Sequence, residues 1–406
     1  MSVWPSSPAH HRWLDQHSRD LLAFGRRTAD PHGGARWLDD HGVPMPDRPV
    51  SVLISSRMAH VYGIGALLGV PGAGRIAARA LAGLTGRLRD PRGGWFPAAA
   101  ADGTPEPGKT CYDHAFVLLA ASTAVQAGLP GADELLDEAG RVLLARFWDD
   151  EVGLCADTWD SGFTKLDDYR GVNANMHAVE AMLSVASVTG DHAWVTRALR
   201  VCRFVVTTAE AHRWRIPEHY DAAWRPLPDY HRDEPDHPFK PYGATIGHGL
   251  EWSRLLLHAA SAPTAGESAW LSTAARELFA RAVTDGWAVD GQPGFVYTTD
   301  WTGRPVVRDR MHWVAAEGVH AAAALHAYTR EPEYAQWYRT WWDYIDEHLI
   351  DHEHGSWFHQ LDPENAPTAT VWPGKADLYH AFQATLGPRV PLWPMLATAV
   401  DEHLTV

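Results

Sequence analysis

The sequence predicts an all-α fold, an (α/α)6 barrel of about six helix hairpins with short β-hairpins or loops inserted between them. Three observations support this prediction. Apolar residues recur with helical periodicity along most of the 406-residue chain, the helical stretches come mostly in pairs, and one histidine recurs at intervals of 54 to 71 residues. Recurrence of one element indicates a repeat architecture, and we expect residues 1–406 to form a single catalytic domain.

The helical stretches follow one another along the whole chain. Between the pairs lie short segments that combine turn and strand signals, for example at residues 94–96 and 294–297. The predicted helices are 8–27, 55–69, 73–88, 111–127, 132–147, 173–188, 192–208, 246–261, 267–284, 311–328, 332–349, 376–386 and 393–403.

The recurring histidines mark the first helix of successive pairs. Stretches such as residues 114–121 are apolar nearly all round, which is typical of helices inside a large helical protein. In a closed ring these inner helices run parallel, so that their N-termini meet at one mouth. An open solenoid of helix pairs is the alternative, and it would spread the histidines along a surface. The histidines are His60, His114, His177, His248, His312 and His380.

Composition excludes several classes of function. The net charge is −15, so we expect no nucleic-acid partner and no anionic membrane surface. No long apolar run and no signal peptide are recognised in the sequence. Three well-separated cysteines suggest a reducing compartment, and we expect a cytoplasmic protein. A homo-oligomer is a possible assembly state.

The strongest chemical signal is His248, which lies three residues before Glu251. Residues three apart share one face of a helix, where the carboxylate fixes the tautomer of the imidazole and makes it more basic. The same spacing occurs at His177 and Glu180. A solvated ion pair is the alternative for either pair, but two pairs at corresponding repeat positions favour a functional interpretation.

A second reactive imidazole is predicted at His380, on the last inner helix. Closure of the ring would bring this residue towards the other histidines, although a histidine at such a position taken alone is more often part of the core. A neutral imidazole can abstract a proton next to a carbonyl near pH 7. The two histidines therefore offer an acid and a base.

Motifs for cofactors are missing from the sequence. Residues 351–354, Asp-His-Glu-His, precede a glycine turn and are interpreted as a solvated loop instead of a metal site. No glycine-rich phosphate loop and no serine nucleophile motif are present. We therefore expect chemistry without a cofactor or a metal. The 20 tryptophans either fill a large core or stack on sugars.

The segment 225–243 is predicted to be a mobile lid. Its five prolines forbid a helix, and it ends shortly before His248. Lys240 is the residue expected to reach the substrate, because Arg232 lies in an acidic stretch that can pair with it. A passive surface loop is the alternative.

Several short runs of the chain resemble the N-acylglucosamine 2-epimerase superfamily, in particular its mannose isomerase and sulfoquinovose isomerase branch. The resemblance covers nearly the whole chain, and the runs together are highly specific. They are residues 56–60, 112–116, 173–177, 247–251, 312–317, 355–358 and 378–380.

The resemblance implies an (α/α)6 barrel and an aldose–ketose isomerase that works through a cis-enediol. It implies that His248 and His380 are the acid–base pair and that Glu251 supports His248. The substrates implied are D-mannose, or a related aldose such as D-lyxose, and D-fructose or the matching ketose. Residues implied to line the sugar site are Arg57, Tyr112, Asn173, His177, Trp313, Glu317 and Gln360.

Other functions stay open from the sequence. A sugar 2-epimerase of the mannose, glucose or cellobiose type would use the same two histidines, and a sulfoquinovose isomerase would differ only in its substrate. A glycoside hydrolase needs two opposed carboxylates, whereas the predicted starts of the inner helices offer mainly histidines. A non-catalytic role in sugar binding or protein scaffolding would leave the convergence of His248 and His380 without a purpose.

Overall fold

The computed structural model describes residues 3–263, 266 and 268–405. It divides into two compact units. The predicted single domain of residues 1–406 stays a prediction, and its residues 1–2, 264, 265, 267 and 406 lie outside the described part. Unit 1 comprises Met1–Asp20, Cys202–Gly374 and His380–Trp393, and unit 2 comprises Leu21–Val201, Lys375–Tyr379 and Pro394–Val406.

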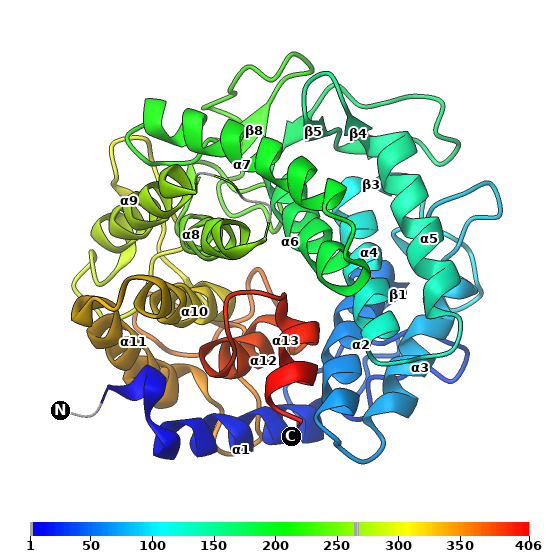
Figure 1. The fold of residues 1–406 in the computed structure, drawn as a ribbon, viewed down its shortest axis with the longest axis horizontal. Coiled ribbons are helices and arrows are strands. Elements are labelled where there is room, and N and C mark those ends of the chain that lie inside the picture. Colours follow the sequence, from blue (N-terminus) through cyan, green and yellow to red (C-terminus); the bar gives the residue numbers. More distant parts are fainter. Residues whose placement is uncertain (1–2, 264–265, 267, 406) are drawn as a thin grey trace. The chain divides into compact units, whose positions relative to one another are not determined.

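Unit 2 is built from helix pairs (Figure 1). Within it, α2 packs against α3 and α4 against α5, while α4 also contacts α2 and α6. The C-terminal α13 contacts α2, α4 and α6, and α7 passes into unit 1 after Val201. The helices are α2 (Val52–Leu67), α3 (Ala73–Thr85), α4 (Cys111–Gln126), α5 (Ala132–Val142), α6 (Val172–Thr189), α7 (Ala193–Ala211) and α13 (Leu396–His403).

Unit 1 repeats this pattern. Here α8 packs against α9 and α10 against α11, and α8 contacts α10. Single π-helical turns at Leu143–Phe147 and Ile345–Leu349 extend α5 and α11. The helices are α1 (Pro8–Gly25), α8 (Ile246–Ser261), α9 (Ala269–Gly286), α10 (His312–Thr329), α11 (Pro332–Tyr344) and α12 (Tyr379–Leu386), besides short 3-10 turns at Trp4–Ser6 and Gly387–Arg389.

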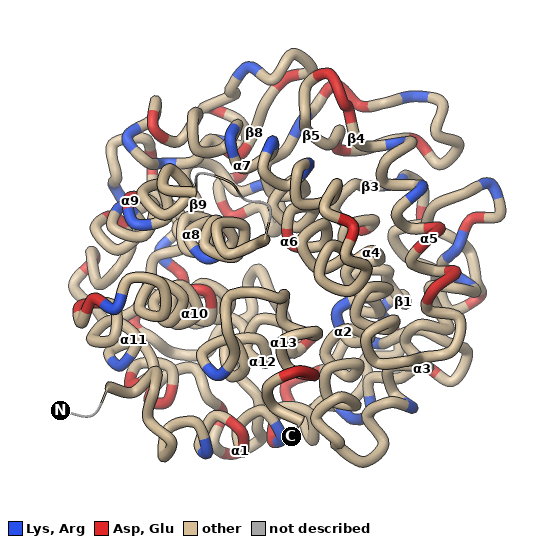
Figure 2. The backbone as a smooth tube through the Cα atoms, viewed as in Figure 1, with Lys and Arg blue, Asp and Glu red and all other residues tan. Residues whose placement is uncertain are grey.

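The first helix of each pair is buried on all sides, as the sequence predicts. In α10, every residue from Val314 to Leu325 is buried. Glu317 is its only Lys, Arg, Asp or Glu, and the tube of this helix is almost free of charge in Figure 2. A charged side chain inside such a helix is costly unless it is paired, so the few charges on the inner helices mark candidate functional positions.

Short antiparallel strands hold the starts of the inner helices. Strands β1, β3, β9 and β12 end directly before α2, α4, α8 and α10. They belong to the ladders β1–β2, β3–β6, β11–β10–β9 and β12–β13, and β4 pairs with β5. The strands are β1 (Val50–Ser51), β2 (Ala98–Ala99), β3 (Lys109–Thr110), β4 (Trp148–Asp149), β5 (Leu154–Cys155), β6 (Thr158–Trp159), β7 (Arg170–Gly171), β8 (His219–Tyr220), β9 (Ala244–Thr245), β10 (Thr298–Thr299), β11 (Pro305–Val307), β12 (Arg310–Met311) and β13 (Gln360–Leu361).

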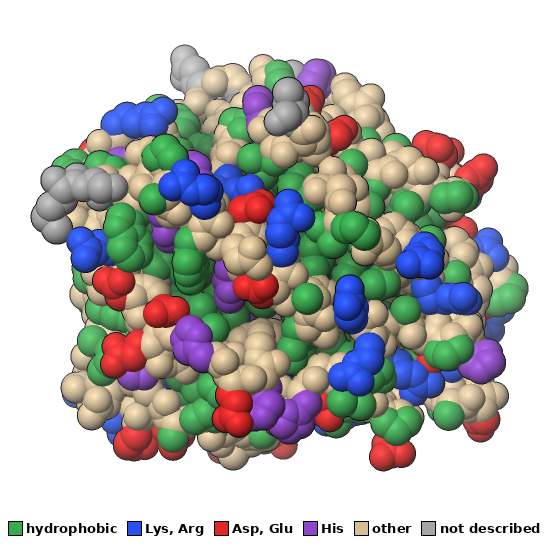
Figure 3. Space-filling view, turned by 90° about the horizontal axis from the view of Figure 1, so that it is seen from below, with side chains coloured by type: hydrophobic (Ala, Val, Ile, Leu, Met, Phe, Trp, Pro, Cys, Tyr) green, Lys and Arg blue, Asp and Glu red, His purple; other side chains and the backbone are tan. Residues whose placement is uncertain are grey.

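The predicted helices are confirmed, with shifts at some of their ends. The predicted start of the helix 267–284 falls on residue 267, outside the described residues, and α9 begins at Ala269. Among the described helices, none combines the length and the apolar character needed to cross a bilayer. On the face drawn in Figure 3, Lys and Arg side chains lie among Asp and Glu side chains and form no continuous basic area.

Candidate active site

The six repeat histidines are all buried. Five of them lie within the first two turns of an inner helix. The prediction is wrong for His60, because α2 begins at Val52, where Ser51 caps it, so His60 lies more than two turns into the helix. The surroundings of each ring, and not its position alone, must therefore decide which histidine is reactive.

His248 is held by a carboxylate from a distant part of the chain. Its Nδ1 lies 2.8 Å from Oε1 of Glu218, and both side chains are buried. A carboxylate only accepts hydrogen bonds, so Nδ1 carries the proton. In the neutral ring Nε2 is then the basic nitrogen, and no described residue bonds it.

This geometry corrects the expected role of Glu251. The sequence predicts that Glu251 supports His248, but the Nδ1 atom of that ring is taken by Glu218. Glu251 instead faces Arg254, whose Nη2 lies 3.4 Å from its Oε1. One helical turn brings residues 248 and 251 onto one side of α8 without joining their functional groups, because residue spacing fixes a face and not a side-chain direction.

His380 is also held by a carboxylate. Its Nδ1 lies 3.0 Å from Oε1 of Glu317, so Nδ1 carries the proton and Nε2 is the basic nitrogen of the neutral ring. Oε2 of Glu317 accepts a hydrogen bond from Nε of Arg254 at 2.8 Å. Glu317, expected among the sugar-lining residues, thus anchors His380, and Arg254 joins it to Glu251.

The acidic groups around His380 have the composition of a metal site. Ligand-type atoms of Glu251, Glu317 and His380 all lie within 4.8 Å of one another. However, the buried guanidinium of Arg254 already bonds to both carboxylates and offsets part of their charge. A divalent cation would have to displace it, which supports the expectation of metal-free chemistry, itself still a prediction.

Trp313 is a common neighbour of the two histidines. Its ring centroid lies 5.3 Å from that of His248 and 5.7 Å from that of His380. Gly247 makes room for the indole, since a Cβ there would lie 2.2 Å from it. Trp313 is half-buried, which suits its predicted role as a surface against which a sugar can stack.

Gln360 does not fit its predicted role as a sugar ligand. Its side chain is fully buried, and its Nε2 donates to Asp309 and Thr370. Its Oε1 accepts from the backbone amides of residues 371 and 372, so every hydrogen-bonding group is used by the protein. The preceding His359 instead stacks on His312, with ring centroids 3.9 Å apart.

In unit 2 the structure brings Arg57 and Tyr112 together. The Arg57 guanidinium lies 2.9 Å from Asp377 and donates to the Tyr112 hydroxyl at 3.1 Å. It also lies over the ring of Phe116, 4.7 Å from the centroid. Asp377 was not singled out in the sequence, and it is the ion-pair partner that holds this guanidinium.

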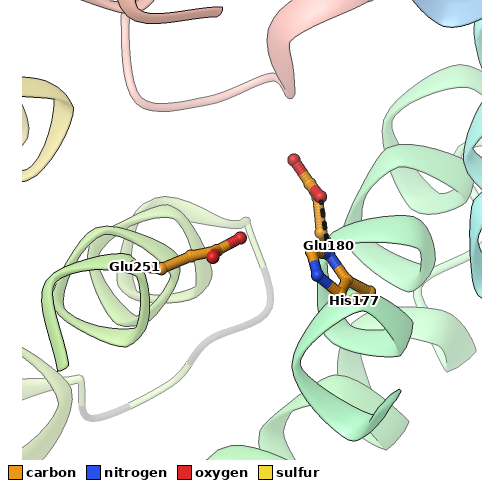
Figure 4. Close-up of side chains that lie close together, drawn as sticks. All are labelled: His177, Glu180 and Glu251. Atoms are coloured by element: carbon orange, nitrogen blue, oxygen red, sulfur yellow. Dashed lines mark ion pairs between the residues drawn. The ribbon is translucent and has the colours of Figure 1, made fainter. Parts of the chain in front are cut away.

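The spacing of His177 and Glu180 produces the expected contact. Figure 4 shows both side chains on α6, with Nδ1 of His177 3.7 Å from Oε2 of Glu180. Tyr379 donates a hydrogen bond to the same carboxylate, and the ring of Tyr112 contacts His177 edge-on, with centroids 5.0 Å apart. Asn173, near the start of α6, has a buried Oδ1 without a hydrogen bond from any described residue.

His60 and His114 are held by neutral groups. His60 Nδ1 lies 2.6 Å from the Thr123 hydroxyl. His114 contacts the Thr110 carbonyl through Nδ1, and its Nε2 accepts from the backbone amide of Trp95. Burial lowers the pKa of each ring to about 4. Both rings are therefore neutral near pH 7 and hold the inner helices to their surroundings.

The segment 225–243 contains no helix, as predicted. The expected pairing of Arg232 is confirmed, because its Nη1 lies 3.0 Å from Asp229. Lys240 is half-buried, and its carbonyl accepts a hydrogen bond from His231. Its contact with a substrate, like the mobility of the segment, stays a prediction.

Comparison with known proteins agrees with these features. The N-acylglucosamine 2-epimerase (GlcNAc 2-epimerase) family model matches residues 33–384. The chain is 47% identical to the D-mannose isomerase of Thermobifida fusca, over 98% of this chain and 99% of the relative. It is 45% identical to that of Pseudomonas cannabina pv. alisalensis, over 98% and 97%.

A solved structure shows the same fold. The crystal structure of a D-mannose isomerase matches with a TM-score of 0.88 and 28% identity, over 94% of this chain and 99% of that one. This similarity confirms the predicted (α/α)6-barrel fold class.

Proposed function

The chain belongs to the N-acylglucosamine 2-epimerase family, and from this premise we propose that it is an aldose–ketose isomerase that interconverts D-mannose and D-fructose. The observation that carries the proposal is the pair of imidazoles, His248 and His380, each with Nδ1 on a buried carboxylate. The D-mannose isomerases that match nearly the whole chain support the choice of reaction and substrate.

The proposed reaction is a proton transfer between adjacent carbons of the open-chain sugar. One imidazole removes the proton from C2 through Nε2, which gives a cis-enediol, and a proton is then delivered to C1. The other imidazole moves the hydroxyl proton from O2 to O1. The C2–H bond breaks and a C1–H bond forms, so no oxidant or reductant is needed. Two positioned acid–base groups that work near neutral pH suit this chemistry.

Sugar-binding roles for other residues rest on the family resemblance. Arg57, Tyr112, Asn173 and His177 offer hydrogen-bond donors and acceptors for sugar hydroxyls, and Trp313 offers an apolar face. Gln360 is excluded from this set because the protein uses its whole amide. Lys240 stays a proposed ligand on the segment 225–243.

Product analysis tests the proposed function. Purified protein is incubated with D-mannose, and the sugars are separated by chromatography. We expect D-fructose. Accumulation of D-glucose without D-fructose would make the protein a 2-epimerase, and no conversion of D-mannose would refute the substrate. Parallel incubations with D-lyxose and sulfoquinovose measure the substrate range.

Other properties stay proposals. The family match extends over residues from both units, which supports one catalytic domain. The three cysteines are buried free thiols, which supports a reducing, cytoplasmic location. A small monosaccharide is the proposed partner, and the homo-oligomeric state is left to a sedimentation measurement.

A further inference from the structure

We propose that Glu218 and His219 are positioning residues that clamp residues 241–248 at both ends and thereby set the orientation of the His248 ring. The proposal deepens the proposed function and rests on it for its kinetic consequences. It concerns two residues that no sequence pattern singled out. It makes the basic nitrogen of the site depend on the strand β8.

The clamp has two points of contact. Glu218, next to β8, holds Nδ1 of His248 at 2.8 Å. His219, the first residue of β8, places Nε2 2.8 Å from the carbonyl oxygen of Pro241. Successive side chains of an extended segment point to opposite sides, so neighbouring residues can hold two separate points of one passing segment. Both side chains are buried, which keeps water from competing for these bonds.

Each bond fixes the proton position of a ring. The acceptor for His219 is a carbonyl oxygen, so its Nε2 carries the proton. Burial lowers the pKa of His219 to about 4, so this ring stays neutral near pH 7. The acceptor for His248 is a carboxylate, so its proton is on Nδ1. The clamp thereby leaves Nε2 of His248 as the nitrogen that takes the substrate proton.

The held segment has little freedom between its two ends. Gly243 has a φ of +90°, and a Cβ at this position would lie 2.1 Å from the carbonyl oxygen of Thr299. The next two residues form β9, which pairs with β10. A displacement at Pro241 is therefore passed along a short, hydrogen-bonded path to the start of α8.

The clamp also limits how far the predicted lid, the segment 225–243, can move. Besides Pro241, the segment 225–243 is tied at Pro228, whose carbonyl accepts from the Trp301 indole at 2.9 Å. Any closing motion is then confined to residues 229–240. Closure would pull on Pro241 and, through His219, would act on the neighbouring Glu218, which holds His248.

The test combines kinetics with the proton position of His248. The variants are Glu218→Gln, Glu218→Asp, His219→Phe and His219→Gln. The matched control is Glu331→Gln, which removes a half-exposed carboxylate that pairs with Arg276. Nitrogen-15 NMR of histidine-labelled protein reports the tautomer of His248. The signal of this ring is assigned by its disappearance in the His248→Asn variant.

We expect the parent protein to show His248 protonated on Nδ1. Glu218→Gln should lower kcat by about 10²–10³-fold with a KM within about threefold, because the ring loses its charged anchor while sugar contacts remain. Glu218→Asp should recover part of the rate. His219→Phe should lower kcat by about tenfold. His219→Gln keeps a hydrogen-bond donor, so its kcat should stay near that of the parent, as should the kcat of the control Glu331→Gln.

Three results would overturn the proposal: a parent His248 protonated on Nε2, a Glu218→Gln variant with unchanged kcat, or a His219→Phe variant with unchanged kcat. The NMR measurement needs no substrate, so a protein that does not convert D-mannose can still confirm or refute the clamp. If Glu218→Gln does not fold, the parent tautomer and the His219 variants decide.

Discussion

His114 in α4 and His248 in α8 occupy nearly equivalent places, the fourth and third residues of two inner helices. Their surroundings differ in one respect. Both nitrogens of His114 bond to backbone groups, whereas Nδ1 of His248 bonds to the Glu218 carboxylate and its Nε2 has no bond to a described residue. The repeat supplies the position of a histidine, and the bonding partner separates a structural ring from the ring that we propose to be reactive.

The same contrast extends to the charges of the helices. Helix α4 carries one acidic residue, Asp113, which bonds locally to Thr110 at its own N-terminus. Helices α8 and α10 carry Glu251, Arg254 and Glu317, which bond to one another and to His380. Charges placed this deep are retained at a cost in stability, which fits a role in chemistry.

The largest effect should follow from removing either reactive ring. His248→Asn and His380→Asn should each lower kcat by about 10²–10⁴-fold, because an acid–base group is lost. Circular dichroism should show an unchanged fold. Activity within tenfold of the parent in either variant would contradict the assignment of that ring.

A smaller effect should follow from neutralising the anchor of His380. Glu317→Gln should lower kcat by about 10–10²-fold, since outer contacts that orient a reactive group commonly contribute this much. It should also destabilise the fold by about 1–3 kcal/mol, because buried Arg254 loses a charged partner. Steady-state kinetics and urea unfolding measure the two effects. If only stability changes, Glu317 supports the helices and not the chemistry.

Removing His114 should act on stability alone. His114→Ala should lower the free energy of unfolding by about 2–5 kcal/mol, because it leaves a cavity and unpaired backbone groups at residues 95 and 110. The folded fraction should keep the parent kcat. Loss of kcat in well-folded protein would break the comparison between the two rings.

The pH dependence of stability follows from the same ring. The pKa of His114 is lowered from 6.5 to about 4 in the folded chain. Between these values the unfolded chain binds more protons, so the free energy of unfolding falls as the pH decreases from about 6.5 to about 4. The slope is about 1.4 kcal/mol per pH unit for each such histidine. Urea unfolding of His114→Gln should show a slope smaller by this amount, and an unchanged slope would refute the assignment.

Chelation should have no effect. The Arg254 guanidinium already bonds to the carboxylates of Glu251 and Glu317, where a cation would have to bind, so activity should survive exhaustive dialysis against EDTA. Activity is measured before dialysis, after dialysis, and again after Mg²⁺ or Mn²⁺ is added back. Activity that is lost and then restored by a metal would refute the proton-transfer mechanism.

Much of the fold can be predicted from local sequence patterns, and the errors of that prediction are also local. The inner helices could be located as long, nearly continuous apolar stretches, because their side chains are buried on every side. The start of α2 was missed because Ser51, outside the periodic run, caps it through the Ile54 amide. The last inner helix begins only at Tyr379, since residues 375–378 are not helical and the backbone of Lys375 bonds to Leu38 instead.

The sequence singled out the two rings proposed to be reactive, but it did not identify which residues bond to them. The repeat identified His248 and His380, whereas Glu218 lies 30 residues before His248 and belongs to no periodic pattern. Arg254 could have been noticed as one of two charged residues other than histidine in an apolar helix. Gln360 was misassigned because sequence matching cannot show that an amide is already used by its own loop.

The measurement that tests the central claim most directly is conversion of D-mannose in heavy water. If nitrogen atoms of His248 and His380 carry the proton between C2 and C1, that proton exchanges with solvent during some turnovers. Sugars recovered after many turnovers should then contain deuterium at C1 of D-fructose and at C2 of D-mannose, as mass spectrometry and NMR will show. Full conversion without carbon-bound deuterium would indicate a direct hydride shift and would contradict the account.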